Sequence, residues 1–145
     1  MNMFVTSKEE VRRFFCDTWR KARSGDLLTP MEAIARDWML QHPEYASDLS
    51  DLEAALSADY DAALGKANPF LHLSMHLSIS EQISIDQPPG LRDAYARLAE
   101  RLGSEHEAHH GIMECLGEMM WTSQRNNLPP DGSAYVECVK RRAHG

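Results

Sequence analysis

Residues 104–121, SEHEAHHGIMECLGEMMW, gather three histidines and four glutamates in one segment of helical character. Successive residues of an α-helix are rotated by about 100°, so these histidines share a face with Met113, Leu116 and Met120. Glu107, Glu114 and Glu118 fall at the border of this face. Because a buried imidazole must find a hydrogen-bond partner or a metal, the stretch predicts a core helix with a polar site on its inner side.

A second core helix is predicted over residues 68–86, NPFLHLSMHLSISEQISID. Asn68 can cap this helix and Pro69 suits its first turn, whereas the Pro88-Pro89-Gly90 run stops it. His72 and His76 lie one turn apart in the middle of its apolar arc. Two helices therefore each direct an HxxxH pair toward the core.

The remaining segments predict an all-α, single-domain helical bundle of about six helices over residues 1–145. Capping signals and apolar periodicity indicate further helices at residues 8–23, 30–42, 49–64 with a break near Ser57, 91–102 and 133–142. His42 is interpreted as a helix-end histidine, favoured at the negative end of the helix dipole.

Composition narrows the class of protein. The chain has 145 residues and a formal net charge of −7, with scattered basic residues, so we expect no nucleic-acid partner. It has neither a leader-like N-terminus nor an apolar run of spanning length, so we expect a cytoplasmic protein with no membrane partner. Cys16, Cys115 and Cys138 are odd in number and form no CxxC pair, so we expect reduced core cysteines.

The first hypothesis is a metal site between the two core helices. Imidazoles four residues apart can converge on one ion, and two such pairs could supply three or four nitrogen ligands. Zinc and iron are the ions favoured, and an open coordination position would suit hydrolysis or other Lewis-acid chemistry. The expected metal-site residues are His72, His76, His106 and His110, with Glu114 as a carboxylate ligand or a hydrogen-bond partner of a ligand.

Two alternatives remain open, and with them whether the protein is an enzyme. Residues 106–110 read HEAHH and match the H-E-x-x-H signature of zinc-dependent hydrolases, in which Glu107 would be the general base. Glu107 can instead be the capping partner of Ser104. The second alternative is a structural or protein-interaction module whose histidines and glutamates form a metal-free network. A homodimer through the helical face that carries Trp121 is compatible with either.

The segments NPFLHLSMHLSISEQ, DQPPG, HEAHH, ECLGEMMW and QR resemble an uncharacterised bacterial family, the domain of unknown function 1841. The resemblance implies a small cytoplasmic helical protein with no assigned activity. In that family the segment at residues 106–110 usually reads HEAEH. His106 and His110 therefore fit the family pattern, whereas His109 departs from it and is the weaker candidate for a ligand.

Overall fold

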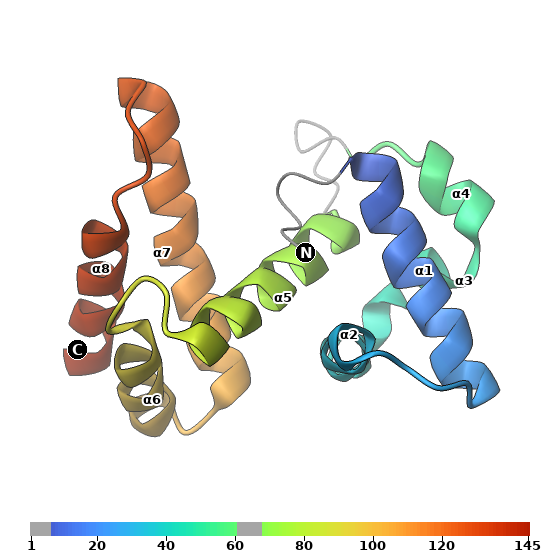
Figure 1. Ribbon diagram of the computed structural model, residues 1–145, viewed down its shortest axis with the longest axis horizontal. Helices are drawn as coiled ribbons and strands as arrows, with labels where there is room; N and C mark the ends of the chain where they lie inside the picture. Colours follow the sequence, from blue (N-terminus) through green and yellow to red (C-terminus); the bar gives the residue numbers. More distant parts are fainter. Residues whose placement is uncertain (1–6, 61–67) are drawn as a thin grey trace. The chain divides into compact units, whose positions relative to one another are not determined.

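The structure is a computed structural model that describes residues 7–60 and 68–145 (Figure 1). The predicted all-α class is confirmed, since the described residues form helices and turns and contain no strand. They contain eight α-helices and one short 3₁₀-helix rather than about six. The elements are α1 (Lys8–Ser24), α2 (Pro30–Leu40), η1 (Pro43–Tyr45), α3 (Ala46–Ser50), α4 (Leu52–Ser57), α5 (Pro69–Ile85), α6 (Leu91–Leu102), α7 (Glu105–Asn126) and α8 (Gly132–His144).

The larger number of helices comes from the segment expected as one helix at residues 49–64. In its described part, α3 ends at Ser50 and α4 begins at Leu52, because Asp51 is extended and its side chain caps α4 by accepting from Ala54 N–H. Leu64 and Gly65, which were expected to complete this segment, lie outside the described residues.

The chain divides into two compact units, residues 1–78 and 79–145, and α5 contributes to both. In the first unit α1 packs against α2, α3 and α4. Its buried apolar core draws on these helices and on the first half of α5, with Val11, Phe15, Cys16, Ala35, Trp38, Met39, Leu49, Ala55, Phe70, Leu73 and Leu77. The prediction of a single domain stays a prediction.

Capping sets the ends of the helices in the first unit. Thr29 and Glu32 form the predicted capping box of α2, in which each side chain accepts from the backbone N–H of the other residue. Glu32 also pairs with Lys21 at 3.0 Å, which ties α2 to the end of α1. Gly25 ends α1 in the left-handed region, where glycine is favoured.

The second unit is built on three helices, α6, α7 and α8, each packed on the other two. Gly103 terminates α6 in the left-handed region, and Ser104 then caps α7 through its hydroxyl, which accepts from Glu107 N–H. The buried apolar residues of these helices are Leu91, Ala94, Leu98, Ala108, Ile112, Met113, Cys115, Leu116, Tyr135, Val136, Cys138 and Val139.

The expectation that all three cysteines are reduced was wrong for two of them. Cys115 on α7 and Cys138 on α8 form a disulfide, with Cα atoms 5.8 Å apart, whereas Cys16 is free and buried as expected. The two helices run side by side as a hairpin in Figure 1, so residues 23 positions apart in sequence become neighbours. Cysteine spacing could not reveal this pairing, because helix packing creates it.

No helix in residues 7–60 and 68–145 is both long and apolar enough to cross a membrane.

A buried arginine links α1 to α4 and to the residue that follows α4. Arg12 on α1 is 2% exposed, and its guanidinium donates to the carbonyl oxygens of Ala55 and Ala58 at 2.7 and 2.9 Å. The same guanidinium lies 5.2 Å from the ring centroid of Tyr60 and 5.5 Å from that of Phe70. The charge is thus compensated by carbonyl dipoles and aromatic faces.

Replacing Arg12 with methionine should therefore lower the free energy of unfolding by about 2–4 kcal/mol, since it leaves buried carbonyls without their donor. The matched control is Arg13→Met, which removes an exposed ion pair with Glu9 and should cost at most about 0.5 kcal/mol. Urea unfolding followed by circular dichroism measures both values. Equal losses in the two variants would contradict this account of Arg12.

Candidate metal centre

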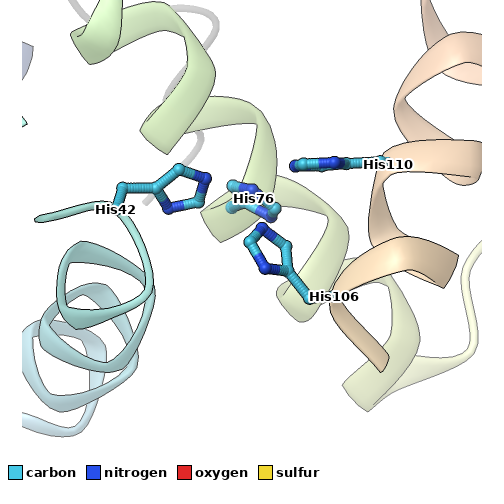
Figure 2. Close-up of side chains that lie close together, drawn as sticks. All are labelled: His42, His76, His106 and His110. Carbon is cyan, nitrogen blue, oxygen red and sulfur yellow. The ribbon is translucent and has the colours of Figure 1, made fainter. Parts of the chain in front are cut away.

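Three histidines of the first unit come together. His42 follows the end of α2, and His72 and His76 lie one turn apart on α5. His42 and His76 are buried, whereas His72 is half-buried. Figure 2 draws His42 and His76, whose rings come from these separate elements. The predicted pair His72 and His76 is therefore joined by a third histidine that the sequence analysis had assigned to a helix end.

The Nε2 atoms of this group, the His42–His72–His76 cluster, converge. His72 Nε2 lies 3.1 Å from His42 Nε2 and 3.2 Å from His76 Nε2. The three ring centroids are 4.7 to 5.0 Å apart. Nitrogen ligands about 2.0–2.1 Å from a tetrahedral metal lie about 3.3 Å from one another. The two Nε2–Nε2 distances at His72 are close to this value.

The tautomer of His42 follows from its second ring nitrogen. His42 Nδ1 lies 2.8 Å from the carbonyl oxygen of Trp38. A carbonyl oxygen can only accept a hydrogen bond, so Nδ1 must carry the proton. In the neutral ring this leaves a lone pair on Nε2, which is the form that binds a metal.

The two contacts of His72 Nε2, to His42 and to His76, cannot both be ordinary two-centre hydrogen bonds. Its Nε2 carries either one proton or one lone pair, and it faces two other Nε2 atoms. If it donates, its single proton is shared between two acceptors. If it accepts, its single lone pair is shared between two donors, and His42 could donate only as an imidazolium. A cation between three lone pairs removes this conflict.

Aromatic rings support the cluster. The Trp38 ring stacks on that of His76, with centroids 4.0 Å apart and planes 13° apart. Tyr45 stacks on His42 at 5.2 Å with an interplanar angle of 4°. Burial raises the pKa of Tyr45 above its ordinary value, with smaller contributions from Glu44 and Asp48, so the ring stays neutral. These contacts restrict the rotation of two of the three imidazoles.

The second unit carries the other predicted pair. His106 and His110 lie one turn apart on α7, with ring centroids 4.4 Å apart in an edge-to-face arrangement (Figure 2). Glu107, the general base of the hydrolase alternative, is exposed, and its backbone N–H donates to the Ser104 hydroxyl at 3.1 Å. The reciprocal half of the expected capping box is not formed, because Ser104 N–H donates to the Ala99 carbonyl at 3.3 Å rather than to the Glu107 carboxylate.

Glu114 lies elsewhere on α7. Its carboxylate is 64% exposed and pairs with the guanidinium of Arg142 on α8 at 2.6 Å. This ion pair joins α7 to α8. The contact with Arg142 gives Glu114 a structural role at the surface of the α7–α8 pair, and this role needs no metal.

His109, the weaker candidate, is buried against the ring of Tyr95, with centroids 5.5 Å apart. Burial lowers the pKa of His109 to about 3, and His106 and His110 contribute in the same direction. The ring is therefore neutral at physiological pH. It serves as a polar core residue of the second unit.

Sequence analysis missed His42 as a member of the cluster. One signal was present, since Trp38 and His42 are four residues apart and His42 precedes Pro43. A histidine at a helix end can turn Nδ1 onto the carbonyl four residues earlier, which fixes its tautomer. The proximity of His42 to α5 depends on tertiary packing, which no local pattern reports.

Comparison with known proteins gives one match. The family model described as a domain of unknown function (DUF1841) matches residues 7–141 of the chain. No curated protein and no solved structure matches the sequence or the fold.

The low pKa of His109 makes stability depend on pH. Between its ordinary pKa of 6.5 and about 3, the unfolded chain binds a proton at this residue and the folded chain does not. The contribution of neutral His109 to the free energy of unfolding is therefore fully present above about pH 6.5. It falls as the pH drops, by about 2 kcal/mol at pH 5. Urea unfolding of metal-free protein at pH 8 and pH 5 measures the loss.

The variant His109→Gln should lose less stability than the wild type between these two pH values, because it has no imidazole to protonate at this position. His144→Gln, at the exposed C-terminus, is the control and should keep the full loss. An unchanged pH dependence in His109→Gln would refute the assignment.

Proposed function

The chain belongs to the DUF1841 family, and we propose that it binds one divalent transition-metal ion through the imidazoles of His42, His72 and His76. The observation that carries this proposal is the approach of His72 Nε2 to the Nε2 atoms of both His42 and His76, at 3.1 and 3.2 Å. His42 supports it further, because its Nδ1–H is committed to the Trp38 carbonyl and its lone pair points into the cluster.

The ligand set selects the class of ion. Three neutral imidazoles favour zinc, iron, nickel or copper over magnesium and calcium, which prefer oxygen ligands. Zinc and iron remain the ions we favour. Three protein ligands also leave a coordination position for water or a substrate. His72 is the half-buried member of the cluster. Such an ion would supply Lewis-acid chemistry at that position.

The sequence hypothesis adds His106 and His110 as ligands of the same ion. Their spacing on α7 suits chelation, and their rings already adjoin one another. This addition stays a hypothesis, and it separates cleanly from the three-histidine proposal by mutation. Glu114 is not included, because Arg142 already pairs with its carboxylate.

The competing function is a metal-free packing module. It predicts that the same histidines stabilise the fold without any ion, and that added metal has no effect on melting. The shared Nε2 of His72 favours the metal, since a network without a cation leaves one of its two contacts poorly bonded.

The metal proposal predicts about one ion per chain in protein prepared without a polyhistidine tag, stripped with a chelator and then exposed to zinc or iron. Binding should raise the melting temperature, because the ion binds the folded state. His72→Ala should weaken binding by at least about 100-fold, since it removes the central ligand. Elemental analysis and calorimetry measure stoichiometry and affinity. His144→Ala, outside the cluster, is the control and should bind as the wild type does.

Trp38 offers an independent readout, since its ring stacks on His76. Nickel or copper bound to His76 should quench its fluorescence, and His72→Ala should reduce this effect at low metal concentration.

The double variant His106→Ala/His110→Ala then tests the wider ligand set. A large loss of affinity would place these residues on the same ion, and unchanged binding would leave the first unit as the whole site. A wild-type protein that neither binds nor is stabilised by any of these ions would reject the proposal.

A further inference from the structure

A pocket of about 250 Å³ lies between α7 and α8 in the second unit and has the Cys115–Cys138 disulfide in its wall. Both cysteines line it, together with Glu118, Asp131 and Arg141. A disulfide is an electrophile toward thiolates, so its presence in the wall of a pocket gives that pocket a reactive group. The metal proposal uses none of these residues.

The two sulfurs differ in their surroundings. Cys115 is 1% exposed and Cys138 is 7% exposed. Cys138 also lines a second hollow, formed with residues of α6, α7 and the end of α8, whereas Cys115 does not. Glu118 Oε2 lies 3.5 Å from Cys138 Sγ. A carboxylate this close opposes a thiolate on Cys138, so the bond should break with the negative charge on Cys115.

The charges around the pocket have both signs. Glu118 and Asp131 supply carboxylates, and Arg141 supplies a guanidinium. Asp131 is fixed as the cap of α8, because its side chain accepts from Ala134 N–H at 3.1 Å. A ligand with one ammonium and one carboxylate group can pair with both signs at once, whereas a ligand with a single anionic group meets two carboxylates.

We propose that this pocket binds a small zwitterionic thiol of the amino-acid type and exchanges it with the Cys115–Cys138 disulfide by attack at Cys138. In this arrangement the ammonium of the thiol faces Glu118 and Asp131, and its carboxylate faces Arg141. The pocket thus provides both a recognition site and a two-electron redox partner.

The exchange runs in two steps. The thiolate of the ligand attacks Cys138 Sγ, a new S–S bond forms between ligand and Cys138, and the Cys138–Cys115 bond breaks. Cys115 leaves with the electron pair and takes up a proton. A second ligand thiolate then attacks its counterpart in the mixed disulfide, which releases the Cys138 thiol. Two thiols are oxidised to one small disulfide, and the protein disulfide is reduced to two thiols.

Free Cys16 provides an internal reference. It lies in the first unit, is buried, and burial raises its pKa to about 11, with Asp17 and Asp51 adding to the effect. It therefore carries little thiolate under native conditions. Any adduct on Cys16 would report unfolding.

The test uses folded full-length protein with a chelator present and three thiols at equal thiolate concentration: cysteine, mercaptoacetate and cysteamine. Peptide mass spectrometry after acid quenching locates the first adduct. The proposal expects it on Cys138, and expects cysteine to react about 3- to 10-fold faster than mercaptoacetate. The variant Arg141→Gln should reduce the advantage of cysteine over cysteamine, whereas Arg125→Gln, outside the pocket, should leave it unchanged.

Three results would overturn the proposal. The first is a first adduct on Cys115. The second is equal rates for the three thiols at equal thiolate concentration. The third is reduction at a rate that is independent of thiol concentration and equal to the unfolding rate, which would make the disulfide purely structural. All three are read on the wild type, so they stand even where a variant folds poorly.

Discussion

The hydrogen bond from His42 Nδ1 to the Trp38 carbonyl is the constraint on which the histidine cluster depends. It fixes the proton on one side of the ring and leaves the other side as an acceptor, directed at His72. The bond forms at the C-terminal end of α2, where His42 follows the C-cap residue Gln41 and the Trp38 carbonyl also accepts from Gln41 N–H at 3.2 Å. The end of α2 thereby fixes the tautomer of His42.

The two units use buried histidine in different ways. In the first unit His72 Nε2 lies within 3.2 Å of the Nε2 atoms of both His42 and His76. In the second unit His109 packs against Tyr95 and is held neutral by burial. The first arrangement places imidazole nitrogens against one another, whereas the second places an imidazole edge-on to an aromatic ring. The same residue type therefore forms a cluster of imidazoles in one unit and a packing contact in the other.

The sequence was a good guide to helices and a partial guide to the site. Caps at Ser7, Thr29 and Asn68 are local chemistry, and the helices that they begin are confirmed. Positions four apart are also local, so the pairs His72–His76 and His106–His110 could be found. His42 and the Cys115–Cys138 disulfide could not, because their partners lie 30 and 23 residues away and meet only through helix packing. The division into two units was likewise hidden, because α5 reads as one continuous helix across the boundary.

The disulfide also changes what the cysteine content implies about the chain. Cysteines in a reducing compartment stay paired only transiently, and those in an oxidising compartment stay paired for structural reasons. Both cysteines line a pocket, and Cys138 Sγ lies 3.5 Å from the Glu118 carboxylate. A bond in this position can respond to the thiols around it. Cys16, the third cysteine, is buried in the first unit and takes no part in this disulfide.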